Sequence, residues 1–119
     1  MKILLVFAGG GLGSVFRYLM SIYMVSGTGL PYATIVANFC ASFLLGMSSL
    51  FLAKSDNDTL KYILAIGFCG GFSTFSTFSL ENYNFLKDQA YFLMMLNIFL
   101  NLILCLAGVF LGINLAKQI

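Results

Sequence analysis

The chain has 119 residues, of which 61% are hydrophobic and 8% are charged, with a mean hydropathy of +0.99. Soluble domains carry about 25% charged residues, so this composition excludes a water-covered globular domain. The net charge of +2 is too small to indicate a nucleic-acid partner. A helix needs roughly 20 apolar residues to cross a bilayer, and residues 1–119 therefore hold a single membrane domain of four spans.

We predict an all-α integral membrane fold with transmembrane helices over about residues 3–25, 31–53, 59–83 and 90–115. The turns between them are expected at residues 26–30, 54–58 and 84–89. Pro31 is tolerated in the first turn of the second helix. Asp58 is the predicted N-cap of the third helix.

Lysines are distributed unevenly between the two ends of this bundle. Lys2, Lys54, Lys61 and Lys117 belong to the end that holds both termini, whereas Lys87 belongs to the opposite end. The positive-inside rule therefore predicts cytoplasmic termini, although the difference is small enough that the inverted orientation stays open. We expect the chain in the cell (plasma) membrane.

The third apolar segment has an unusual centre, residues 67–79, with two adjacent glycines followed by five hydroxyl residues within seven positions. These residues are poor helix formers. One interpretation is a helix broken in mid-membrane, whose freed backbone groups face an ion or water. The other is that small residues simply permit close helix packing. The combination of glycines, hydroxyls and regularly spaced phenylalanines favours the broken helix.

Phe72, Phe75 and Phe78 recur every three residues and share one helix face. The positive edge of a phenylalanine ring can contact a small anion weakly, and weak binding suits conduction because the ion must also leave. Spacing alone favours a packing or lipid-facing stripe.

Amides stand inside two other segments. Asn38 lies in the middle of the second, and Asn97 and Asn101 share a stripe with Cys105 in the fourth. Uncharged amides at this depth either join neighbouring helices or line a wet path, and the pattern leaves both interpretations open.

Arg17 is the one charged residue well inside a predicted span, which makes it a functional candidate. It can attract anions to a pore mouth or cap the carbonyl groups of a broken helix. Glu81 is its natural counter-charge.

Pairs of small residues four positions apart indicate tight helix contacts, either between subunits or within one subunit. These pairs are Gly9 with Gly13, Ser42 with Gly46, Gly67 with Gly71, and Gly108 with Gly112.

At these motifs the chain resembles the Fluc/CrcB family of fluoride channels over essentially its whole length. Residues 9–18 resemble the family's glycine-rich opening, and residues 34–46 resemble its second-span motif. Residues 67–79 resemble its third-span signature, Gly-Phe-Cys-Gly-Gly-x-Thr-Thr-Phe-Ser-Thr-Phe-Ser, nearly residue for residue. Ser73 replaces the usual threonine, and the fourth span carries Asn97, Asn101 and Cys105 where many members have tyrosine and serines.

The resemblance implies a passive, fluoride-specific channel that exports fluoride from the cytoplasm. It implies an antiparallel, dual-topology homodimer with two pores and a structural Na⁺ held centrally by the backbone carbonyls of Gly70 and Ser73. It assigns the vestibule to Arg17 and Glu81. The fluoride path is assigned to Asn38, Phe75, Phe78, Thr74, Ser76 and Thr77, and the stripe of the fourth span adds Asn97 and Asn101.

Two other functions stay open. The chain could be one subunit of a heteromeric channel pair that needs a homologous second chain. It could also be a proton-coupled exporter like the small multidrug resistance proteins, but spans one and two lack the membrane-embedded carboxylate that this mechanism needs. We see no catalytic base, nucleophile or metal-hydrolase cluster, so we do not expect an enzyme.

Overall fold

The computed structural model describes residues 1–25 and 27–119, and in this part of the chain every element is helical. The elements are α1 (Lys2–Tyr23), α2 (Tyr32–Lys54), α3 (Asp58–Leu60), the π-helix η1 (Lys61–Cys69), α4 (Gly70–Phe72), α5 (Phe75–Lys87) and α6 (Tyr91–Gln118). Position 26 of the predicted first turn lies outside the described residues. The wide winding of η1 was not predicted from the sequence.

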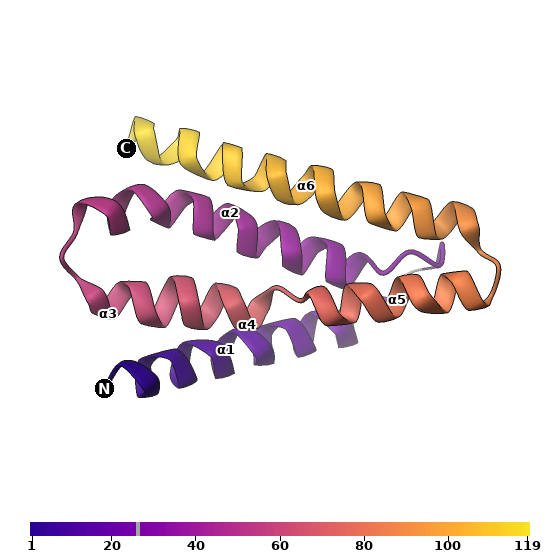
Figure 1. The fold of residues 1–119 in the computed structure, drawn as a ribbon, viewed down its shortest axis with the longest axis horizontal. Coiled ribbons are helices and arrows are strands. Elements are labelled where there is room, and N and C mark those ends of the chain that lie inside the picture. Colours follow the sequence, from indigo (N-terminus) through magenta and orange to yellow (C-terminus); the bar gives the residue numbers. More distant parts are fainter. Residues whose placement is uncertain (26) are drawn as a thin grey trace.

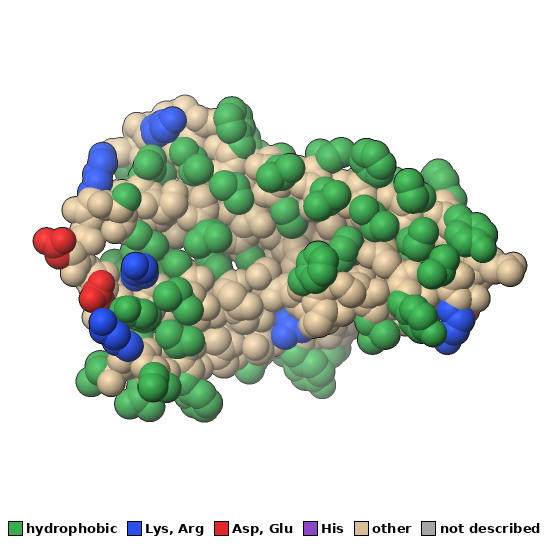
Figure 2. Space-filling view, viewed as in Figure 1, with side chains coloured by type: hydrophobic (Ala, Val, Ile, Leu, Met, Phe, Trp, Pro, Cys, Tyr) green, Lys and Arg blue, Asp and Glu red, His purple; other side chains and the backbone are tan. Residues whose placement is uncertain are grey.

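Four of the described stretches are long and apolar enough to cross a membrane: Lys2–Tyr23, Tyr32–Lys54, Asp58–Lys87 and Tyr91–Gln118. They lie side by side, and both termini and the α2–α3 connection lie at the same end of the bundle (Figure 1). Hydrophobic side chains cover the face shown along its length, while charged groups gather mainly at the two ends (Figure 2). A surface of this kind suits lipid rather than water, and the chain is a multi-pass membrane protein.

The third span contains two residues that are not helical. α4 ends at Phe72, Ser73 adopts ψ 155°, and Thr74 adopts φ −151° and ψ 119° before α5 begins at Phe75. The span also extends beyond its predicted end, because residues 84–87 are helical. Its stop comes at Gln89, with φ 57°.

The stop of α5 is a well-formed C-terminal cap. The amide of Ala90 donates to the carbonyl of Phe85 at 2.8 Å, and the amide of Gln89 donates to that of Leu86 at 3.1 Å. These two bonds, with a left-handed residue between them, form the Schellman motif. The predicted loop 84–89 is therefore mostly helix. The polar residues of this segment suggested a helix end near residue 84, but the cap lies at Gln89.

The start of the third span also differs from the prediction. Asn57, not Asp58, is the N-cap, and its side-chain oxygen accepts from the amide of Thr59 at 3.1 Å. Asp58 is instead the first helical residue, and it lies 3.8 Å from the ammonium of Lys2. A carboxylate in a first helical turn is stabilised by the helix dipole, which explains why both positions carry polar residues.

Two packed pairs of spans build the bundle. α2 packs against α6, and α1 packs against the first half of the third span, which consists of η1 and α4. Glycines make each contact close. A Cβ at Gly13 would lie 2.3 Å from the carbonyl oxygen of Phe68, and one at Gly112 would lie 2.3 Å from that of Phe43. The pairs containing these glycines therefore make contacts within one subunit, one of the two alternatives that the spacing left open.

We expect Gly13→Ala and Gly112→Ala to destabilise the chain by about 1–3 kcal/mol each, because the added methyl group meets rigid backbone. Gly11→Ala is the matched control, since a Cβ there meets nothing within 4 Å. Thermal unfolding in detergent measures the difference. Equal melting temperatures for the Gly11 and Gly13 variants would contradict this packing.

Candidate functional site

The site is built around Ser73 and Thr74, the two extended residues between α4 and α5. The Ser73 hydroxyl donates to the carbonyl of Cys69 at 2.8 Å and completes the last turn of α4. The Thr74 hydroxyl accepts from the amide of Thr77 at 3.2 Å and caps the start of α5. The carbonyl end of one helix thus meets the amide end of the next, an arrangement that presents partial charges of both signs.

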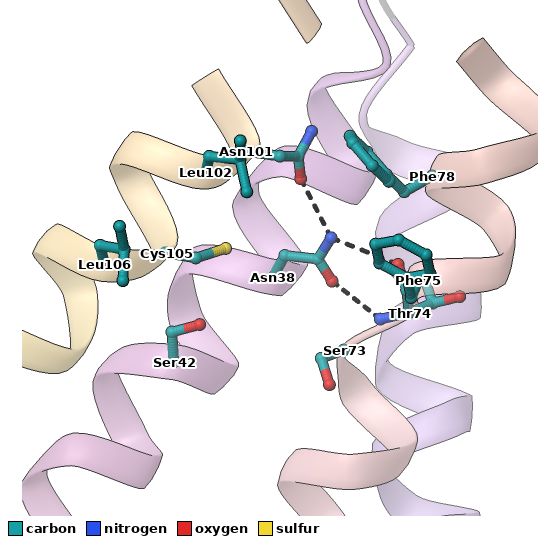
Figure 3. Close-up of a pocket in the computed structure, with 10 residues that line it drawn as sticks. All are labelled: Asn38, Ser42, Ser73, Thr74, Phe75, Phe78, Asn101, Leu102, Cys105 and Leu106. Atoms are coloured by element: carbon teal, nitrogen blue, oxygen red, sulfur yellow. Dashed lines mark hydrogen bonds between the residues drawn. The ribbon is translucent and has the colours of Figure 1, made fainter. Parts of the chain in front are cut away.

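Asn38 of α2 joins these two helix ends. Its Oδ1 accepts from the backbone amide of Thr74 at 2.8 Å, and its Nδ2 donates to the carbonyl of the same residue at 3.3 Å (Figure 3). In an uninterrupted helix, the Thr74 amide would donate to the carbonyl of Gly70. The side chain of Asn38 replaces that partner, so the extended backbone is hydrogen-bonded although it lies between helices.

A series of hydrogen bonds between asparagine side chains starts at Asn38. Its Nδ2 also donates to Oδ1 of Asn101 at 3.0 Å, and Nδ2 of Asn101 donates to Oδ1 of Asn97 at 2.9 Å. Asn97 is fully buried and donates to Oδ1 of Asn82 at 3.1 Å. Both Nδ2 protons of Asn38 therefore have partners inside the chain.

A pocket of about 310 Å³ opens beside this junction, between α2, α5 and α6. Its walls combine amides, hydroxyls, aromatic rings and a thiol, without a charged side chain (Figure 3). They are Asn38, Ser42, Ser73, Thr74, Phe75, Phe78, Asn101, Leu102, Cys105 and Leu106. The ring centroids of Phe75 and Phe78 lie 5.4 Å apart, and Phe75 is 77% exposed. A pocket of this composition can solvate a small ion without a fixed charge.

A second pocket of about 400 Å³ carries the charge that the first one lacks. Arg17 lines it together with Thr34, Thr74 and Thr77. The Arg17 Nε–H donates to the carbonyl of Gly71 at 3.2 Å, so this side chain caps a carbonyl group at the end of α4. Thr74 lines both pockets, so the two lie on either side of this residue.

Arg17 and Glu81 do not pair with each other. In the described parts of the chain, the one ion pair within 4 Å is that of Lys2 with Asp58. Oε1 of Glu81 accepts instead from the Thr34 hydroxyl at 2.5 Å, and its Oε2 is buried with no hydrogen-bond partner. The two charged groups are thus stabilised separately.

Gly70 and Ser73 together line a smaller hollow of about 140 Å³, with Cys69 and with Ser42, which also lines the first pocket. Gly70 is exposed, and a Cβ there would meet nothing within 4 Å. Residues 1–25 and 27–119 hold no cluster of three His, Cys, Asp or Glu side chains suited to a metal ion. A cation at this hollow would therefore depend on backbone carbonyls.

Most of the predicted path residues meet at these pockets. Asn38, Asn101, Thr74 and both phenylalanines line the first, and Thr77 lines the second. Ser76 is exposed and its hydroxyl lies 3.3 Å from that of Thr74. Asn97 lines neither pocket, because it lies behind Asn101.

Sequence reasoning missed two polar contributors to the site. Ser42 lines the first pocket, and it had been considered only as a small residue for helix packing. Asn82 was not singled out in the sequence, although it donates to the Phe78 carbonyl and accepts from Asn97. Its position four residues after Phe78, on the same helix face, was the available signal.

Comparison with known proteins identifies the family of this chain. A family model described as CrcB-like protein, Camphor Resistance (CrcB), matches residues 4–113. The chain belongs to the CrcB-like family.

Relatives in this family match nearly the whole chain. The fluoride-specific ion channel FluC of Coxiella burnetii (strain CbuK_Q154) is 39% identical over 124 aligned residues, covering 100% of each chain. FluC of Elusimicrobium minutum is 42% identical over 117 residues, covering 94% of this chain and 90% of the relative. FluC of Pyrococcus furiosus is 39% identical over 119 residues, covering 98% of this chain and 97% of the relative. These CrcB-like relatives are named as ion channels, which are not enzymes.

We expect a water-soluble thiol reagent to modify Cys105, which lines the first pocket, but not Cys69, which is 3% exposed. A Cys40→Ser background removes the third thiol. Mass spectrometry of the protein in liposomes measures the modification, and Cys105→Ser should abolish it. Failure of Cys105 to react would show that water does not reach this pocket.

Proposed function

We propose that this CrcB-like chain is a fluoride-specific ion channel that passively exports fluoride from the cytoplasm across the cell membrane. The observation that carries the proposal is the uncharged pocket of amides, hydroxyls and phenylalanine rings at the α4–α5 junction. The names of the relatives, which cover the whole chain, support the same ion.

The chemistry of the pocket suits a small and strongly hydrated anion. A path must replace the hydration shell of such an ion while binding it weakly enough for release. The rings of Phe75 and Phe78, whose edges carry partial positive charge, and the hydroxyl of Ser42 suit both conditions. The Thr74 hydroxyl donates to that of Thr77, so its role is to cap α5. Because the amide protons of Asn38 bond within the chain, its main contribution is to hold Thr74.

The position of Arg17 adds long-range attraction to this local solvation. Arg17 lines the second pocket, which shares Thr74 with the first. A cation at the entrance raises the local concentration of anions, but it does not trap them in the narrow part. Hydrogen fluoride enters cells as a neutral weak acid and ionises inside, so a passive pathway lowers internal fluoride without energy coupling.

We further propose an antiparallel homodimer with a structural Na⁺ at its centre. The diverted amide of Thr74 leaves the Gly70 carbonyl without its usual helical partner, and the Ser73 carbonyl lies in extended backbone. Carbonyl groups at a helix interruption are ligands that transporters use for Na⁺. The open space at Gly70 leaves room for a second chain to approach. The same two carbonyls from each subunit would hold the ion, and it would stabilise the dimer without being transported.

Reconstitution of the purified chain alone tests the function. We expect liposomes loaded with potassium fluoride to release fluoride, measured with a fluoride electrode, while liposomes loaded with chloride retain it. Release that appears only with a homologous second chain would indicate a heteromeric pair. Release that depends on a proton gradient would indicate an exporter that uses Glu81, and either result would contradict the proposal.

Substitutions in the pocket test the path. We expect Phe75→Ile and Asn38→Asp to abolish fluoride release while the protein still folds. The first removes an aromatic ring from the pocket, and the second removes the Nδ2 donor to the Thr74 carbonyl and adds a negative charge to the pocket wall. Phe92→Ile and Asn84→Asp are matched controls, since Phe92 is 76% exposed on α6 and Asn84 is exposed on α5. Wild-type release from both pocket variants would refute the assignment.

A further inference from the structure

Four asparagines from three helices form one continuous hydrogen-bonded chain. It begins at the Thr74 amide and passes through Asn38 of α2, Asn101 and Asn97 of α6, and Asn82 of α5. It ends where Nδ2 of Asn82 donates to the carbonyl of Phe78 at 2.9 Å. Each asparagine accepts from the preceding member and donates to the next.

The direction of this chain is imposed by its backbone ends. A backbone amide can only donate, so the group of Asn38 that faces Thr74 must be the oxygen. A backbone carbonyl can only accept, so the group of Asn82 that faces Phe78 must be the nitrogen. The carbonyl of Asn97 adds a third constraint, because it accepts from Nδ2 of Asn101 at 3.0 Å. These fixed groups leave one orientation for all four side-chain amides.

Both ends of the chain lie on the first turn of α5. The Thr74 amide precedes Phe75, and the Phe78 carbonyl closes the same turn, so the two rings stand between the two anchor points. The middle of the chain is well buried, with Asn97 0% and Asn101 5% exposed. A buried amide that loses its partner is costly, so the members of the chain hold one another in place.

We infer that Asn82 and Asn97 are positioning residues. Through Asn101 and Asn38 they fix the position and rotation of the first turn of α5. They thereby also fix where the rings of Phe75 and Phe78 lie. The alternative is a purely structural role, in which the amides only hold neighbouring helices together. Joining helices needs neither a consistent direction nor two ends on the same turn. The consequence for conduction rests on the proposed function, because only there do the rings line a fluoride path.

Hydrogen exchange tests the inference without reference to fluoride. The Thr74 amide is protected by Asn38, so loosening the chain should expose it. We expect Asn82→Leu and Asn97→Leu, in the assembled protein in lipid nanodiscs, to raise exchange in peptides covering residues 73–79 about tenfold, the change that about 1.4 kcal/mol produces. Peptides from α1 should exchange as in the wild type. Asn84→Leu, an exposed site on the same helix, is the control.

Unchanged exchange at residues 73–79 in both variants would overturn the inference. A uniform rise along the whole chain would also overturn it, because that pattern is general destabilisation. Asn82 is half-buried, so Asn82→Leu tests the chain even where Asn97→Leu does not fold.

Fluoride release from liposomes separates this inference from the proposed function. We expect both variants to release fluoride about tenfold more slowly, in proportion to the loss of protection, while the Asn84→Leu control keeps the wild-type rate. Local exchange that rises in a protein whose wild type conducts no fluoride would support the positioning role and refute the channel. Wild-type release rates despite faster local exchange would overturn the part of the inference that concerns the rings.

Discussion

The pairing of the Asn38 side chain with the Thr74 backbone is the interaction on which the rest of the site depends. A bilayer offers no hydrogen-bond partners, so extended backbone within a span must be satisfied by protein groups. One asparagine amide provides both a donor and an acceptor, and it pairs with Thr74 as a neighbouring backbone would. The amide of Thr74 is thereby diverted from the carbonyl of Gly70, its partner in a continuous helix. The pocket, the ring pair and the free carbonyl end of α4 all follow from that diversion.

The division of charge within the molecule has a related physical cause. The lysines and aspartates lie at the bundle ends, where water hydrates them, while the first pocket is lined by neutral groups. Arg17 is the exception inside a span, and it is stabilised by the carbonyl of Gly71 at the end of α4. The partial negative charge of a helix end thus takes the place of Glu81, which the sequence predicted as the counter-charge of Arg17. In the proposed channel, a neutral lining near a positive side chain would attract anions and still release them.

Particular residues show how far the sequence could predict this structure. The four spans were predicted from apolar length alone, and the family from motifs in the first three segments. Two helix ends were misplaced, at Asn57 and at Gln89, because the local polar sequence allowed several caps and hydrogen-bond geometry selected one. The role of Asn82 was not predicted, because it depends on a partner in α6 and on the Phe78 carbonyl. The dimer, the sodium ion and the fluoride path stay predictions.

The sequence by itself determined that the chain lies in a membrane and crosses it four times. Hydropathy is a sum over residues and needs no knowledge of their neighbours. Only the tertiary structure decided which amide meets which backbone group, where α4 ends and α5 begins, and that Arg17 and Glu81 have different partners. Hydrogen bonds are directional and short-ranged, so their pairing depends on how α2, α5 and α6 lie against one another. Asn38, Asn82 and Asn101 are far apart in the chain, and no local pattern brings them together.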